Sequence, residues 1–170
     1  MAVDAMQRQV DARGLSGTSV PQERLHVTLH WLGDHDDVVP QKLLRGAEDA
    51  ARNVDMAPFG VGFDRMGSLG GAGMGGLALT GSAELKTLRL FQRTLGAAMR
   101  STAAGDHVRT RFNPHVSLLY CERHVPPEPI APIRWTVDEL VLIDSWLGYG
   151  KHVDLGRWRL QSRQTSFSDW

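Results

Sequence analysis

The sequence predicts an α+β fold built from two similar lobes that face one another. Segments with helical periodicity and segments with strict alternation follow in the order helix, strand, helix, strand, strand, helix, strand, strand, strand. A strand with a histidine pattern and a helix occur once in each half, and the two pattern histidines, at positions 26 and 115, are 89 residues apart. That separation is too long for a local repeat and suits two lobes within a single domain over residues 1–160.

Length and composition indicate one ordinary globular domain and exclude several functional classes. The chain has 170 residues, is 42% hydrophobic and 22% charged, and carries no formal net charge, so bulk charge does not make it a polyanion binder. Its single cysteine, Cys121, allows no internal disulfide, which fits a reducing cytoplasm. No apolar run reaches membrane-spanning length and no signal-peptide core is present, so we expect a cytoplasmic protein with no membrane partner.

Three segments have the periodicity of helices: residues 2–13, about 38–54 and about 83–103. The first is followed by two glycines that end it. The second has Pro40 in its first turn. The third opens after Ser82, a favoured cap residue, and its apolar positions include Phe91 or Gln92.

Four further segments have the alternation or β-branched content of strands: residues 58–66, 77–80, 135–143 and 153–160. A glycine-rich run, residues 67–76, connects the first two and lacks the pattern of a phosphate-binding loop. Prolines between residues 126 and 132 predict an irregular connection. Residues 161–170 are polar and predict a loose C-terminal tail.

Two stretches carry the histidine pattern, residues 24–32 (RLHVTLHWL) and residues 112–120 (FNPHVSLLY). Each alternates apolar and polar residues and predicts a half-buried strand. His26 and Thr28 share one face of the first strand, and His115 and Ser117 share one face of the second. We predict that the two strands face a common cleft and act together on a phosphate.

An imidazole with a pKa near 6.5 can give or take a proton at neutral pH. One histidine can remove a proton from an attacking water while the other protonates the departing ribose oxygen, each contributing roughly 10²–10⁴-fold. The hydroxyls of Thr28 and Ser117 can donate hydrogen bonds to the non-bridging phosphate oxygens. No metal or other cofactor is needed. A 2′,3′-cyclic phosphate suits such a site, because its strained ring opens without a strong Lewis acid.

Paired H-x-[ST]-Φ tetrapeptides of this kind resemble those of the two-histidine (2H) phosphoesterase superfamily. The flanks of both tetrapeptides, together with residues 140–145 (LVLIDS) and 155–160 (LGRWRL), are similar to the bacterial and archaeal RNA 2′,3′-cyclic phosphodiesterases, also called 2′-5′ RNA ligases. The resemblance covers about residues 20–160. It implies two lobes of antiparallel sheet with outer helices, and a central groove in which the histidines meet.

The resemblance also implies a reaction and its partners. The substrates would be RNA 3′ ends or small nucleotides with a 2′,3′-cyclic phosphate, hydrolysed to a 2′-phosphomonoester, with 2′-5′ joining of RNA ends as a related activity. The family's roles make His26 the proton donor and His115 the proton acceptor. Two alternatives stay open: a relative that opens another small cyclic phosphate, such as ADP-ribose 1″,2″-cyclic phosphate, and an RNA- or nucleotide-binding module without turnover.

The chain departs from the family in two places. Members open with a strand of the type Leu-Phe-Φ-Ala, whereas residues 2–13 predict a helix, so the first strand is missing and a sheet edge is left unpaired. We expect a monomer, with the C-terminal tail, a partner chain or a solvent-tolerant edge in place of that strand. Second, Tyr120 and Cys121 replace the basic residue expected after the second motif, and Arg123 lies just beyond. Tyr120 and Arg123 are therefore candidate substrate contacts.

The remaining candidates have competing interpretations. His30 shares a face with His26 and would line the groove rim; a zinc site of His26, His30 and His35 lacks a completing Glu or Cys. His152, near the closing strand, is either a substrate contact or a plain surface residue. Four basic residues either gather at the cleft to attract phosphates or are isolated surface charges: Arg24, Arg109, Arg111 and Lys151.

Overall fold

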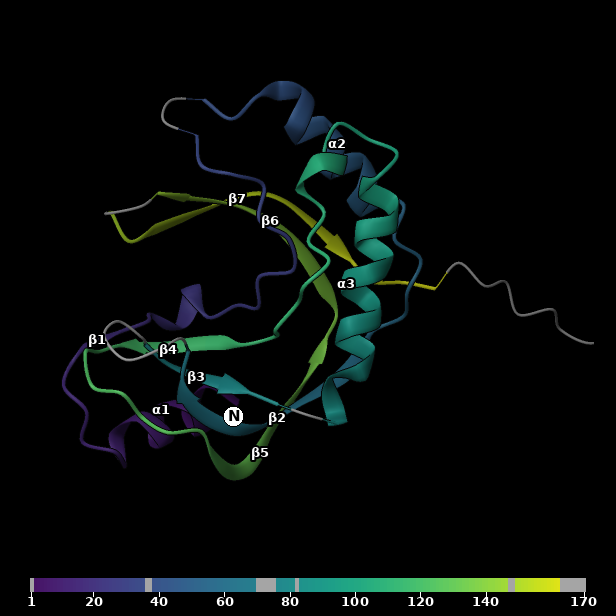
Figure 1. The fold of residues 1–170 in the computed structure, drawn as a ribbon. Helices are drawn as coiled ribbons and strands as arrows, with labels where there is room; N and C mark the ends of the chain where they lie inside the picture. Colours follow the sequence, from purple (N-terminus) through teal and green to yellow (C-terminus); the bar gives the residue numbers. More distant parts are fainter. Residues whose placement is uncertain (1, 36–37, 70–75, 82, 147–148, 163–170) are drawn as a thin grey trace, which may run out of the picture. The chain divides into compact units, whose positions relative to one another are not determined.

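The fold, seen in a computed structural model, is α+β with antiparallel sheets, as the sequence predicts (Figure 1). The structure describes residues 2–35, 38–69, 76–81, 83–146 and 149–162. The chain divides into two compact units. The first unit comprises Met1–Leu29, Gly60–Leu90 and Arg111–Trp135, and the second comprises His30–Phe59, Phe91–Thr110 and Thr136–Trp170.

Five strands form one sheet, most of it in the first unit: β1 (Thr18–Ser19), β2 (Phe59–Ser68), β3 (Leu77–Thr80), β4 (Val116–Tyr120) and β5 (Glu128–Val137). Their order across the sheet is β1-β4-β3-β2-β5. β4 pairs antiparallel with both β1 and β3, and β3 pairs antiparallel with β2. The strand of the second histidine motif, β4, therefore lies inside the sheet, while β1 and β5 are its edges.

The helix α1 (Ala2–Asp11) and the apolar face of the sheet supply the core of the first unit. Met6 and Val10, one turn apart, are the buried residues of α1, which packs against β4. Phe63 of β2 is fully buried and stacks on Trp135 with ring centroids 5.0 Å apart. The predicted N-terminal helix is confirmed, so residues 2–11 add no strand to the sheet.

The second unit combines two helices with a hairpin: α2 (Gln41–Arg52), most of α3 (Lys86–Met99), β6 (Glu139–Trp146) and β7 (Lys151–Arg159). β6 pairs with β7, and α2 contacts both strands. Pro40 is the residue that precedes α2. Gly46 of α2 lets that helix approach closely, since a Cβ there would lie 2.9 Å from the backbone nitrogens of Ala103 and Ala104.

The first histidine motif is not a strand, contrary to the prediction. After β1 the chain forms a short 3₁₀ helix at Gln22–Arg24, and residues 25–35 form neither helix nor strand. Pro21 precedes the 3₁₀ helix and has no N–H to donate to a sheet ladder. The chain therefore leaves β4 before the motif begins, although the motif keeps the alternation that suggested a strand.

The region of residues 126–143 was also predicted wrongly. Most of the proline-rich connection is part of β5, which contains Pro129 and Pro132 and lies at the sheet edge, the place in a sheet where proline is tolerated. The expected single strand over 135–143 is divided at Asp138 into β5 and β6. Asp138 accepts a hydrogen bond from the N–H of Leu160 at 2.7 Å, which ties the end of the last strand to this break.

The remaining expectations concern the third helix, Ser82, the glycine-rich run and the C-terminal tail. The third helix begins at Lys86, after a 3₁₀ turn at Ala83–Leu85, and ends at Met99, so it is shorter than predicted. Ser82 and most of the glycine-rich run lie outside the described residues, as does the tail from residue 163. A last 3₁₀ helix covers Gly105–His107. None of the described helices has the length and apolar character needed to cross a bilayer.

Candidate active site

His115 stands immediately before β4, in a backbone segment that is fixed on both sides. Pro114 is fully buried, and β4 begins at the residue after the histidine. The carbonyl of Phe112 accepts a hydrogen bond from Nη1 of Arg89 at 2.9 Å. Nδ1 of His115 lies 2.8 Å from the carbonyl oxygen of Asn113, so the backbone itself orients the ring.

His26 has the same arrangement in the first motif. It follows the 3₁₀ helix Gln22–Arg24, which is closed by the N–H of Leu25 donating to the Gln22 carbonyl at 3.2 Å. Nδ1 of His26 lies 2.7 Å from the carbonyl oxygen of Arg24. Both motif histidines are therefore anchored through Nδ1 to the carbonyl two positions earlier.

This shared anchor selects one tautomer. A carbonyl oxygen can only accept a hydrogen bond, so Nδ1 of each ring carries the hydrogen. In the neutral ring Nε2 then holds the lone pair, and in the imidazolium form it holds the second proton. Nε2 is therefore the atom through which His26 and His115 can take or give a proton.

The two hydroxyl residues follow the predicted alternation. Thr28 is exposed, and the residues on either side of it are half-buried. Ser117 is half-buried, and its neighbours on β4 are only 1% and 4% exposed. Each motif therefore places an imidazole and a hydroxyl on its more exposed side, over an apolar back.

The chain reaches the first motif from the strand that pairs with β4. β1 runs antiparallel to β4, and the N–H of Val20 continues the ladder by donating to the Leu118 carbonyl at 2.9 Å. In an antiparallel pair the chain at Val20 moves toward the His115 end of β4 before it turns at Gln22–Arg24. Four predicted site residues belong to the first compact unit: His26, Thr28, His115 and Ser117.

His30 belongs to the second unit and is hydrogen-bonded through both ring nitrogens. The N–H of Arg109 donates to its Nδ1 at 3.1 Å, so Nε2 is the protonated nitrogen and donates to the Gln92 carbonyl at 3.0 Å. Burial lowers the pKa of His30; the hydrogen bond to Gln92 opposes this, and the charges of Arg100 and Arg109 reinforce it. Both ring nitrogens therefore have backbone partners, and contact of His30 with substrate stays a prediction.

Tyr120 and Arg123 line a shallow surface hollow in the first unit. The other residues of its lining are Cys121, Glu122 and the segment 14–18. Gly17 lies so close to the carbonyl of Tyr120 that a Cβ would collide with it. Tyr120 is 55% exposed, so its ring is available to a ligand. Substrate contact by Tyr120 and Arg123 stays a prediction.

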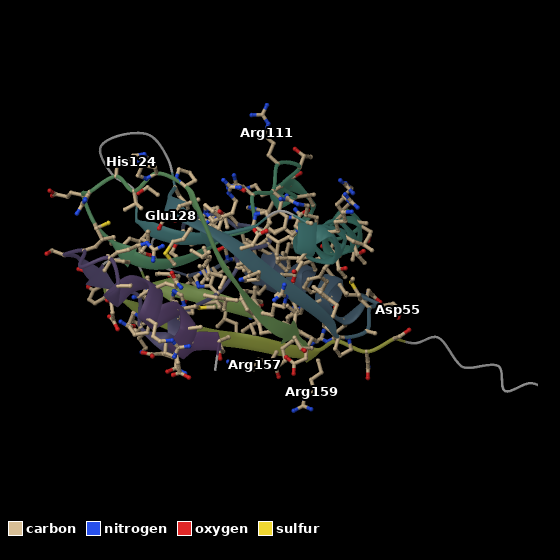
Figure 2. The ribbon with its side chains drawn as sticks, turned by 90° about the horizontal axis from the view of Figure 1, so that it is seen from below. Asp55, Arg111, His124, Glu128, Arg157 and Arg159 are labelled. Carbon is tan, nitrogen blue, oxygen red and sulfur yellow. The ribbon has the colours of Figure 1, made fainter. Side chains whose placement is uncertain are left out.

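His152 lies on β7, opposite Ser145 of β6 in the second unit, and its contact with substrate also stays a prediction. The four basic residues are divided between the units, Arg24 and Arg111 in the first and Arg109 and Lys151 in the second. Figure 2 shows Arg111 extending away from the ribbon. Lys151 lies over the ring of Trp146, with Nζ 4.8 Å from the ring centroid.

Comparison with known proteins decides the family. A sequence profile of the 2′-5′ RNA ligase superfamily matches residues 2–146. The chain belongs to this superfamily. The match takes in both histidine motifs and confirms the resemblance to 2H phosphoesterases. Membership supports a phosphoesterase or RNA ligase activity.

Solved structures agree with the fold of this superfamily. TT0787 of Thermus thermophilus is 24% identical with a TM-score of 0.71, over 96% of this chain and 91% of that one. LigT of Escherichia coli, solved with ATP, is 20% identical with a TM-score of 0.69, over 95% and 93% of the two chains. At these identities the likeness shows the fold alone. No curated protein sequence matches the chain.

Sequence reasoning missed three groups that contact the predicted site histidines. Two are the carbonyl groups of Arg24 and Asn113, which orient the motif histidines and which no side-chain pattern displays. The third is Gln92, a polar residue that is only 3% exposed on α3. A polar residue among the apolar positions of a helix was the available signal for Gln92.

Proposed function

We propose that this protein hydrolyses a 2′,3′-cyclic phosphate, on RNA 3′ ends or on small nucleotides, to a 2′-phosphomonoester. His26 is the proton donor and His115 the proton acceptor, and neither role requires a metal. Thr28 and Ser117 hold the non-bridging oxygens of the phosphate. Joining of RNA ends through a 2′-5′ bond is a related activity, because it is the same displacement with the 5′-hydroxyl of a second RNA end attacking phosphorus in place of water.

The matched anchoring of the two motif rings carries this proposal. Both rings donate from Nδ1 to a backbone carbonyl, at 2.7 Å for His26 and 2.8 Å for His115. A structural histidine needs no such match, whereas acid–base catalysis at one phosphorus needs two rings that both exchange protons through Nε2. Each motif also has a hydroxyl residue two positions after its histidine, exposed in the first motif and half-buried in the second.

The reaction balances with these four side chains alone. Nε2 of His115 takes a proton from water as the oxygen forms its bond to phosphorus. The bond between phosphorus and O3′ breaks, and Nε2–H of the His26 imidazolium gives its proton to O3′. The product keeps the phosphate on O2′. Negative charge that builds up on the non-bridging oxygens is met by the hydroxyls of Thr28 and Ser117.

The test is incubation of the protein with a 2′,3′-cyclic nucleotide, and with an RNA oligomer that ends in a cyclic phosphate, in the presence of EDTA. We expect 2′-phosphate as the product and a bell-shaped dependence of the rate on pH. His26→Ala and His115→Ala should each lower turnover by about 10²–10⁴-fold. His124→Ala is the matched control, because His124 is an exposed histidine in the same unit and has no role in the proposed chemistry (Figure 2).

Other outcomes would replace the proposal. A 3′-phosphate product would contradict cleavage of the bond to O3′. Turnover that EDTA abolishes would contradict metal-independent chemistry. Binding of the oligomer without turnover would favour an RNA- or nucleotide-binding module, and turnover of only a different cyclic phosphate would favour that substrate.

A further inference from the structure

Three segments of the second unit are joined by a closed ring of hydrogen bonds, which we call the His30 triangle. Nε2–H of His30 donates to the carbonyl of Gln92 at 3.0 Å. Nε2 of Gln92 donates to the carbonyl of Arg109 at 2.8 Å. The N–H of Arg109 donates to Nδ1 of His30 at 3.1 Å. Each of the three residues is therefore bonded to both of the others.

The residues of the His30 triangle lie where the chain passes between the two units. His30 is the first residue of the second unit after the first motif. The chain enters the second unit again one residue before Gln92, and it leaves that unit one residue after Arg109. Arg109 is also six residues before His115, and His30 is four residues after His26. The triangle thus bonds the segment that leaves the first motif to the segment that leads to the second.

The packing around His30 leaves little room for the ring to move. A Cβ on Gly96, one turn along α3 from Gln92, would lie 3.2 Å from both Cε1 and Nε2 of His30 and 3.2 Å from Val108. Gln92 is 3% exposed, so its amide would lose a hydrogen bond without gaining one from water if the triangle opened. The ring is therefore held by packing as well as by its two hydrogen bonds.

We infer that His30 is a positioning residue, which acts through the His30 triangle to hold the segments carrying His26 and His115 in the arrangement that the reaction requires. This role rests on the proposed function. His30 itself touches no reacting atom. Misplacement of a catalytic group by about 1 Å, caused by a change away from the chemistry, can cost about 10²-fold in rate.

Three variants at this position separate the two hydrogen bonds. His30→Ala removes both, and we expect kcat to fall about 10- to 100-fold with KM changed much less. An asparagine amide reaches the place of Nδ1, so His30→Asn keeps the acceptor for Arg109; a glutamine amide reaches the place of Nε2, so His30→Gln keeps the donor to Gln92. Each should recover part of the lost kcat. His35→Ala, an exposed histidine in the same unit, is the control and should leave kcat unchanged.

The kinetics are measured on fully folded protein, well below the melting temperature of each variant. A purely structural His30 would lower the melting temperature and leave kcat of the folded protein unchanged, and that result would overturn the inference. A fall in kcat that neither His30→Asn nor His30→Gln reduces would overturn it as well.

A spectroscopic readout keeps this test separate from the proposed function. NMR signals of the Cε1–H groups of His26 and His115 should both shift in His30→Ala, and neither should shift in His35→Ala. This expectation holds even if the wild-type protein turns over no cyclic phosphate. Unchanged signals from both motif histidines in His30→Ala would show that the triangle does not position them.

Discussion

The motif histidines and His30 use the same side chain in opposite ways. His26 is exposed and His115 half-buried, and each is anchored through Nδ1–H to a nearby carbonyl. His30 is packed against α3, and its Nδ1 accepts a hydrogen bond from a backbone N–H instead. The three rings therefore adopt two different tautomers, although His26 and His30 are only four residues apart.

This difference in the hydrogen-bond partner of Nδ1 determines which histidine can gain or lose a proton without reorienting its ring. A ring that donates from Nδ1 keeps this bond when Nε2 is protonated, so His26 and His115 can cycle between acid and base without turning. A ring whose Nδ1 accepts must break its bond on protonation, because both nitrogens of an imidazolium are donors. The hydrogen-bond partner of Nδ1 thus separates the two candidates for catalysis from His30.

The largest expected effect is the loss of the motif histidines themselves. His26→Ala and His115→Ala should each lower kcat by about 10²–10⁴-fold. The double variant should lose little more than the worse single one, because the two rings act in one displacement and their effects do not add. The measurement is kcat for a 2′,3′-cyclic nucleotide. Strictly additive losses of activation free energy would contradict the hypothesis that the two rings act in one displacement.

The sequence predicted best those features that depend on local pattern. The buried pair Met6 and Val10 placed α1 correctly, and an imidazole two residues before a hydroxyl identified both motifs. What failed depended on neighbours distant in the chain. Whether the prolines of β5 interrupt a strand depends on that strand lying at the sheet edge, which no local pattern reveals.

The environment of His30 is a second feature that local sequence pattern could not predict. Alternation placed it on the face of His26, and in an isolated strand it would share that face. Its partners are the carbonyl of Gln92 and the N–H of Arg109, groups that every residue but proline possesses. Only the folded chain shows which backbone groups reach the ring, so the sequence alone could not separate His30 from the motif histidines.

Removing a motif hydroxyl should have the next largest effect. Thr28→Val and Ser117→Ala each take away one donor to the phosphate oxygens, and the loss of such a donor costs about 10²-fold in kcat. KM should change much less, because the charge on these oxygens develops in the transition state. Steady-state kinetics would show this, with Ser101→Ala, an exposed serine bonded to the Ala98 carbonyl, as the control. A change in KM alone would assign the hydroxyls to substrate binding.

A double-mutant cycle between Gly96 and His30 tests whether the His30 ring is held in a fixed position. Alanine is favoured over glycine inside a helix by about 1 kcal/mol, but here its Cβ would press on the fixed His30 ring. We expect Gly96→Ala to lower the free energy of unfolding in the wild-type protein. In a His30→Ala background the substitution should raise it, by less than about 1 kcal/mol because Val108 stays close to the new Cβ. Urea unfolding of the four proteins measures both effects.

Gly60→Ala is the matched control for that cycle. Gly60 lies on β2, and a Cβ there would have no atom within 4 Å. The effect of Gly60→Ala should therefore be the same with and without the His30 ring. If Gly96→Ala also has the same effect in both backgrounds, the ring is free to move aside and the description of a fixed His30 is wrong.

The smallest expected effect is the dependence of stability on pH that His30 contributes. Burial, with the charges of Arg100 and Arg109, holds the pKa of His30 below its ordinary 6.5 in the folded protein. Just below pH 6.5 the unfolded chain binds a proton at this residue that the folded chain does not, so stability is lost as the pH falls, by at most about 1.4 kcal/mol per pH unit. Unfolding in urea at about pH 7.5 and about pH 5.5 should show a larger loss for the wild-type protein than for His30→Gln. The other six histidines are identical in the two proteins, so the difference isolates His30, and equal losses would mean that its ring is not held neutral.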